Sequence, residues 1–162
     1  MMINRLRLAL PIAGLIVFFD QLSKIFIDRR FALYESLEVM ENFFHITYVR
    51  NKGAAFGMFA DSAFRVPFFI CVALLAVVGI LWYLHQVEDS QRGQQIGLSL
   101  VLGGAIGNLV DRVRLGEVID FLDVHWYQYH WPAFNVADIA ICVGVGLLLL
   151  GLWQAERQAK RG

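Results

Sequence analysis

Two aspartates, Asp120 and Asp138, interrupt otherwise apolar sequence and are the strongest candidates for chemistry in this chain. Asp120 lies in the apolar segment 118–123, and Asp138 directly precedes a long apolar run. Two carboxylates brought together cannot both ionise cheaply, so such a pair shares one proton. The ionised member can activate a water molecule while the protonated member donates to a peptide carbonyl. The pair therefore predicts the chemistry of an aspartic protease, with no covalent intermediate.

Each aspartate also has a plainer explanation. Asp138 would gain from the helix dipole if it simply occupied the first turn of a helix. Asp120 and Asp123 could belong to an ordinary solvated loop. An extended segment would point these two acids to opposite sides, whereas a helix would place both on one face. The sequence leaves these alternatives open.

A polar stripe runs along the segment 104–112. Gly104, Asn108 and Arg112 recur every fourth residue, and Asp111 lies beside them on the same helical face. A face with these polar groups cannot point to lipid, so it must face other helices or a wet cavity. The glycines of this segment also allow close helix packing.

Two further pairs of polar residues share a helical face. Asp20 and Lys24 are four residues apart and can pair, either as a structural ion pair or to shape an active site. Asn135 and Asp138 are three residues apart at the start of the last apolar run. Both pairs are therefore candidates for the site.

Other catalytic schemes fit less well. The serines lack a nearby base, and no Gly-x-Ser-x-Gly motif occurs. The two cysteines exclude a disulfide scaffold and any site built from several cysteines. His125 and His130 lack the glutamate of a metallopeptidase helix. We predict neither a metal nor a cofactor.

The elements that must position these residues are membrane helices. The chain is 58% hydrophobic and 17% charged, against roughly 45–50% and about 25% for soluble domains. Balanced charge, with 14 basic and 14 acidic residues, argues against nucleic-acid binding. A membrane helix needs about 20 mostly apolar residues. The sequence predicts an all-α membrane protein with four transmembrane helices, at about 8–28, 66–84, 94–113 and 136–155.

The connection at about 31–65 contains an alternating, β-branched and aromatic stretch at 43–49, which predicts a small extracytoplasmic β-sheet. We expect one integral-membrane domain over 1–162. Basic residues near both termini place those ends in the cytoplasm, although the other side also carries cations. The first span could instead be a cleaved signal peptide, but no small-x-small cleavage site follows it.

Five motifs in order resemble those of the lipoprotein signal peptidases, also called signal peptidase II. The resemblance covers the whole chain, and the five motifs together are specific. The motifs are Asp20-Gln-Leu-Ser-Lys24, Asn51-Lys-Gly-Ala-Ala-Phe-Gly57, Gly103-Gly-Ala-Ile-Gly-Asn-Leu-Val-Asp-Arg112, Val118-Ile-Asp-Phe-Leu-Asp123 and Pro132-Ala-Phe-Asn-Val-Ala-Asp138.

The resemblance implies an aspartyl endopeptidase of the bacterial inner membrane. Its substrates would be diacylglyceryl-modified prolipoproteins, cleaved just before the lipidated cysteine. Its other partners would be membrane lipids and globomycin-type inhibitors, with no nucleic acid.

The resemblance also implies roles for individual residues. Asp120 and Asp138 would be the catalytic dyad. The residues implied to bind substrate are Asn51, Gly104, Asn108, Arg112, Asn135 and Ala137, and those implied to support the site are Asp20, Lys24, Asp111 and Asp123.

Two rival functions remain compatible with intramembrane polar residues. A small transporter or channel also uses them, but such proteins often contain inverted repeats, and none is found in this sequence. A membrane scaffold should tolerate conservative replacement of its polar residues. An aspartate-to-asparagine change would distinguish an enzyme from a scaffold.

Overall fold

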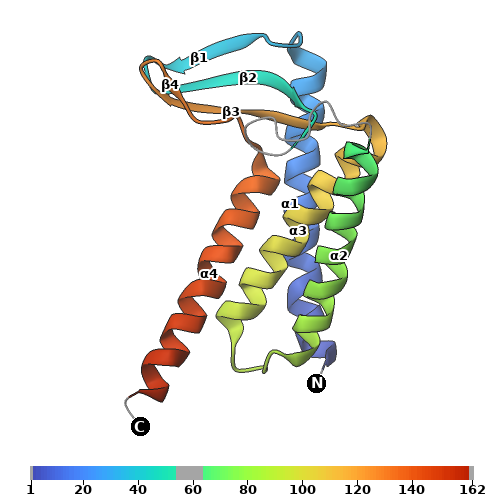
Figure 1. Ribbon diagram of the computed structural model, residues 1–162, viewed down its shortest axis with the longest axis vertical. Coiled ribbons are helices and arrows are strands. Elements are labelled where there is room, and N and C mark those ends of the chain that lie inside the picture. Colours follow the sequence, from blue (N-terminus) through green and yellow to red (C-terminus); the bar gives the residue numbers. More distant parts are fainter. Residues whose placement is uncertain (1, 54–63, 161–162) are drawn as a thin grey trace.

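The computed structural model describes residues 2–53 and 64–160, with side chains from residue 5 onward. Within these residues four long helices carry a four-stranded antiparallel sheet, which confirms the predicted fold class (Figure 1). The elements in order are α1 (Met2–Arg30), β1 (Ser36–Met40), β2 (Phe44–Asn51), α2 (Arg65–Gln86), α3 (Arg92–Leu115), β3 (Val118–Trp126), β4 (Tyr129–His130) and α4 (Val136–Ala159).

All four helices are long and apolar enough to cross a membrane. Helix α2 leaves most of its apolar side chains exposed, including Leu75 at 72% and Val78 at 64%. Such a surface needs lipid rather than water around it. Helix α3 is the most buried of the four, because it packs against α1, α2 and α4. The polar stripe therefore faces the interior of the protein and not lipid, as the sequence predicted.

The sheet lies across one end of the helix bundle, and both termini lie at the other end (Figure 1). Its strands follow the order β1-β2-β3-β4. Apolar side chains of the sheet pack on the end of α1, in a cluster formed by Ile27, Tyr48, Ile119 and Phe121. The alternating stretch 43–49 falls largely within β2, while β3 adds a strand next to it.

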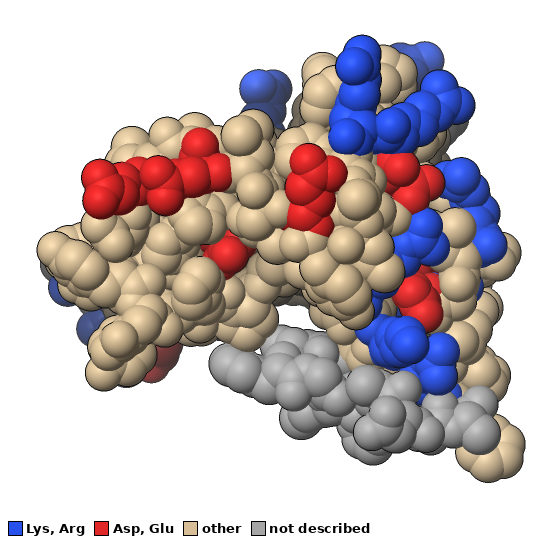
Figure 2. Space-filling model, turned by 90° about the horizontal axis from the view of Figure 1, so that it is seen from above, with Lys and Arg blue, Asp and Glu red and all other residues tan. Residues whose placement is uncertain are grey.

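Strand β3 decides between the two conformations that the sequence left open for 118–123. The segment is extended, so Asp120 and Asp123 point to opposite sides. Seen from the sheet end, most of the visible Lys and Arg gather toward one side of the surface, and acidic groups lie both among them and over the rest of it (Figure 2). This end of the molecule therefore carries both signs of charge.

Glycines bring α3 close to its neighbours. A Cβ added to Gly104 would collide with the carbonyl oxygen of Ala137 on α4, and one on Gly103 would lie 2.7 Å from Cβ of Ile16 on α1. Gly104 is thus a packing residue, with Ala137 as its neighbour across the helix interface.

A single methyl group at Gly104 is expected to destabilise the bundle. Gly104→Ala should lower the free energy of unfolding by about 1–3 kcal/mol, because the collision involves backbone that cannot rotate away. Gly146→Ala is the matched control, since a Cβ there meets nothing within 4 Å. Thermal unfolding in detergent measures both variants. Equal melting temperatures for the two would contradict this account of the α3–α4 contact.

Candidate active site

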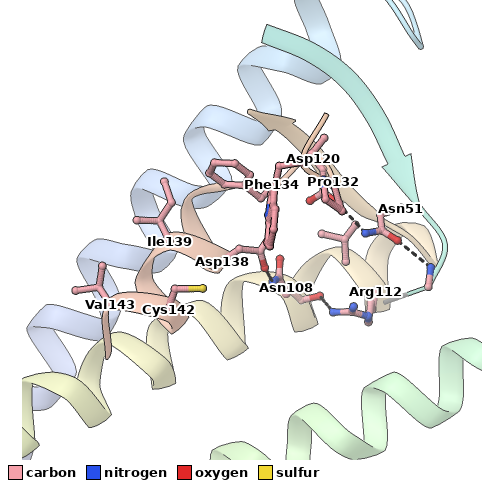
Figure 3. Close-up of a pocket in the computed structure, with 14 residues that line it drawn as sticks. Asn51, Asn108, Arg112, Asp120, Pro132, Phe134, Asp138, Ile139, Cys142 and Val143 are labelled. Carbon is pink, nitrogen blue, oxygen red and sulfur yellow. Dashed lines mark hydrogen bonds between the residues drawn. The ribbon is translucent and has the colours of Figure 1, made fainter. Parts of the chain in front are cut away.

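A cavity of about 570 Å³ lies where the sheet meets the helices, and both Asp120 and Asp138 line it (Figure 3). Its polar wall also includes Asn51 from β2, with Asn108 and Arg112 from α3. These five residues come from four elements that are distant in sequence. The structure thus brings together the residues that the motifs singled out separately.

Asp120 is held in place by two amide groups. Its side chain is on β3, and the residue is only 2% exposed. Nδ2 of Asn51 donates to Oδ2 at 2.9 Å, and Nδ2 of Asn135 donates to Oδ1 at 2.7 Å. Burial raises the pKa of Asp120 to about 7, and the nearby Asp138 carboxylate acts in the same direction. The two amide hydrogen bonds lower the pKa but only in part offset this rise.

Asp138 is positioned by the N-terminal cap of α4. Oδ1 of Asn135 accepts from the Asp138 N–H at 3.0 Å, and Oδ2 of Asp138 accepts from the Asn135 N–H at 3.2 Å. This reciprocal arrangement is a capping box. Asp138 therefore does occupy the first turn of a helix, as its plainer explanation requires, yet the same carboxylate also lines the cavity. Asn135 contacts both acids and fixes one relative to the other.

Asn108 connects Asp138 to a buried lysine. Its Nδ2 donates to Oδ1 of Asp138 at 2.8 Å, while its Oδ1 accepts from Nζ of Lys24 at 2.9 Å. Lys24 in turn lies 2.9 Å from a carboxylate oxygen of Asp20 and 2.8 Å from one of Asp111. None of the three ionic side chains is more than 1% exposed. They form a buried ion cluster of one lysine and two aspartates.

The buried ion cluster holds the backbone next to each cavity aspartate. Oδ1 of Asp20 accepts from the N–H of Ala137, which precedes Asp138, at 2.9 Å. Oδ2 of Asp111 accepts from the N–H of Ile119, which precedes Asp120, at 3.2 Å. The cluster therefore joins α1 and α3 to the two chain segments that carry the acids.

Arg112 is the cation among the described residues of the cavity wall. Its Nη1 donates to the backbone oxygen of Asn108 at 3.3 Å, and its guanidinium lies over the Phe69 ring, 4.9 Å from the centroid. A guanidinium offers five N–H donors. Arg112 can therefore donate to carbonyl oxygens of a bound peptide.

Not every predicted site residue reaches the cavity. Gly104 and Ala137 pack against each other between helices and do not line it. Asp123 points away from Asp120, and its carboxylate lies 2.9 Å from Nδ1 of His130. Residues 54–57 of the second motif lie outside the described residues.

The structure adds residues that sequence reasoning missed. Nε2 of Gln21 lies within 3.2 Å of oxygens of Asp20, Asp111 and Gly107, so it belongs with the buried ion cluster. An apolar wall of the cavity comes from α4, through Ile139, Cys142 and Val143 (Figure 3). The apolar wall could have been predicted from the helical spacing of its residues relative to Asp138. Gln21 could have been predicted as a site residue because it lies inside the first motif.

A family model described as "Signal peptidase (SPase) II" matches residues 12–154. The chain belongs to the signal peptidase II family. A lipoprotein signal peptidase from Syntrophotalea carbinolica is 59% identical over 154 residues, which cover 95% of this chain and 96% of that protein. One from Geobacter metallireducens is 54% identical and covers 88% of each chain.

Solved structures agree with this family assignment. One titled "Bacterial membrane enzyme structure" superposes with a TM-score of 0.80 at 33% identity, covering 90% of this chain and 87% of the other. A second with the same opening words has a TM-score of 0.77, also at 33% identity. The chain is therefore a multi-pass membrane protease of the signal peptidase II family. This assignment favours the peptidase over the transporter and the scaffold.

Proposed function

We propose that the chain is an aspartic endopeptidase that removes signal peptides from diacylglyceryl-modified prolipoproteins, cutting just before the lipidated cysteine. One observation carries the aspartic mechanism: Asp120 and Asp138 line one cavity and share Asn135 as a hydrogen-bonding partner. The names of the relatives support the substrate class.

In the proposed mechanism Asp138 acts as the base and Asp120 as the acid. Asp138 takes a proton from water as the water oxygen bonds to the scissile carbonyl carbon. Asp120 gives its proton to the carbonyl oxygen, which its raised pKa of about 7 allows near neutral pH. When the C–N bond breaks, Asp138 returns its proton to the amine, and the new carboxyl group returns one to Asp120. Both aspartates finish as they began.

The two ends of the cavity suit the two parts of the substrate. Polar groups surround the acids, where Asn51 and Arg112 can donate to the peptide backbone. The opposite wall is apolar and follows α4, on which Ile139 and Val143 are 42% and 51% exposed. Acyl chains can therefore remain in lipid beside α4 while the peptide reaches the acids. A soluble cleft would have to extract those chains from the bilayer.

We place the protein in the bacterial inner membrane with both termini in the cytoplasm. The end with the termini carries Arg5, Arg7, Arg157 and Lys160, which fits the excess of cations on cytoplasmic sides. The sheet and the cavity then lie at the extracytoplasmic surface (Figure 1).

A cleavage assay with purified protein in detergent tests the proposal. A prolipoprotein carrying the diacylglyceryl group and the same chain without lipid are compared by gel shift. We expect cleavage of the lipidated form only. Equal cleavage of both forms would reject the proposed substrate class, and no cleavage by folded protein would reject the peptidase itself.

The rate should follow a bell-shaped dependence on pH, because the mechanism needs one protonated and one ionised carboxyl group. Since the pKa of Asp120 is raised to about 7, its proton is lost as the pH rises through that value. The cleavage rate should then fall about tenfold per pH unit on the alkaline side. Single-turnover rates across pH measure this. A rate that stays constant from pH 6 to pH 9 would contradict the assignment of Asp120 as the acid.

A further inference from the structure

A second cluster of side chains lies in the sheet, away from the cavity. Residue pairing places His45 of β2 directly opposite Asp123 of β3, and His125 is two residues further along β3 on the same side. One ring nitrogen or carboxylate oxygen from each residue lies within 4.8 Å of the others. The cavity aspartate, Asp120, is on the opposite side of β3. The cluster is thus separate from the proposed active site.

Two buried ring nitrogens in this cluster lack hydrogen-bond partners among the described residues. His125 is only 5% exposed, and its Nδ1 has no partner. Nε2 of His45 also has none, although a carboxylate oxygen of Glu38 lies 3.5 Å away. Buried polar atoms are rarely left unpaired in folded proteins. Metal coordination is one arrangement that would satisfy ring nitrogens of this kind.

We propose that His45, Asp123 and His125 form a binding site for a divalent transition-metal ion such as Zn²⁺. Imidazole and carboxylate are ligands that Zn²⁺ accepts, with bonds of roughly 2.0–2.2 Å in a tetrahedron. Tetrahedral donors at these bond lengths lie roughly 3.3 Å apart. The donor atoms, which lie within 4.8 Å of one another, therefore have to close by at most about 1.5 Å to bind the ion. Water completes the coordination.

His130 of β4 supports this site from outside. Its Nδ1 lies 2.9 Å from Oδ1 of Asp123, and its ring stacks on that of His125, with centroids 4.5 Å apart. With a proton on Nδ1, His130 donates to the carboxylate and orients it. Partners of this kind are typical of the outer shell of metal sites.

Metal at this site would join β2 to β3. The same two strands carry Asn51 and Asp120 at their other ends. The ion would therefore stabilise the sheet without taking part in peptide hydrolysis. This inference rests on the side-chain cluster alone and does not depend on the proposed cleavage mechanism.

Zn²⁺ binding to the full-length protein tests the inference. The protein is purified with an affinity tag that contains no histidine, stripped of metal with a chelator, and titrated with Zn²⁺ by calorimetry. We expect one Zn²⁺ per chain and a rise in melting temperature with Zn²⁺ concentration. His125→Ala and His45→Gln should each weaken binding at least about tenfold.

A matched control separates this site from general binding to surface histidines. His85 is exposed at the last turn of α2, at the other end of the molecule, so His85→Ala should bind Zn²⁺ as the unchanged protein does. Melting temperatures without metal show whether each variant still folds. The proposal is overturned if no stoichiometric binding occurs, or if folded His45→Gln retains the affinity of the unchanged protein.

Discussion

Asp120→Asn and Asp138→Asn are each expected to lower the rate of prolipoprotein cleavage by about 10²–10⁴-fold. An asparagine keeps the shape of the side chain but cannot accept or release the proton that the mechanism moves. Both residues line the cavity and contact Asn135, so each replacement removes one half of the same pair. Single-turnover cleavage of a diacylglyceryl-modified prolipoprotein measures the loss.

The matched control is Asp89→Asn, the same chemical change at an exposed residue paired with Arg5, far from the cavity. It should cleave at the rate of the unchanged protein. If Asp120→Asn or Asp138→Asn also retained that rate while folded, the dyad would be wrong, although another peptidase mechanism would remain possible.

The loss of activity in Asp120→Asn should not come from a loss of folding. The pKa of Asp120 is about 7 in the folded protein and near 3.8 in a free chain, so the folded state holds this proton more tightly. Binding of this proton therefore makes its full contribution to the free energy of unfolding below about pH 4, and the contribution disappears as the pH rises toward 7. At higher pH the unchanged protein buries an ionised carboxylate at position 120, whereas asparagine carries no charge. The melting temperature of Asp120→Asn should therefore exceed that of the unchanged protein at pH 8, and the difference should shrink in acid.

The membrane class and the candidate dyad could be predicted because their signals are local. Charge-free runs identify membrane helices residue by residue, and an aspartate such as Asp138 beside such a run is conspicuous. The helical face shared by Asn108 and Arg112 also follows directly from spacing.

Contacts between distant segments could not be predicted in this way. Spacing pairs Asp20 with Lys24, but nothing local indicates that Asp111 completes the cluster from another helix. The position of Asp123 depended on whether its segment was a strand or a helix, which β2 decides by pairing with β3. Gly104 lies on the polar face yet packs against Ala137, because the distance between two packed helices depends on the residues of both helices. Tertiary packing therefore determined the features that the sequence left open.

Lys24→Met is expected to lower the free energy of unfolding by about 3–5 kcal/mol. The replacement has similar length, but it leaves Asp20 and Asp111 buried side by side with no positive charge between them. These carboxylates accept from the N–H groups beside Asp138 and Asp120, so their repulsion should also displace both acids. Cleavage should therefore fall even in the fraction that stays folded, as single-turnover rates corrected for folded protein would show.

Two comparisons isolate the buried charges as the cause. Lys160→Met removes an exposed lysine paired with Glu156, and surface pairs contribute at most about 1 kcal/mol. The triple variant Lys24→Met/Asp20→Asn/Asp111→Asn removes every charge of the cluster, so it should recover part of the stability that Lys24→Met loses. Equal stability of Lys24→Met and Lys160→Met would show that the cluster contributes little to folding. Recovery of stability in the triple variant without recovery of cleavage would show that the charged groups of the cluster position the two acids, through the contacts of Asp20 and Asp111 with the backbone and of Lys24 with Asn108.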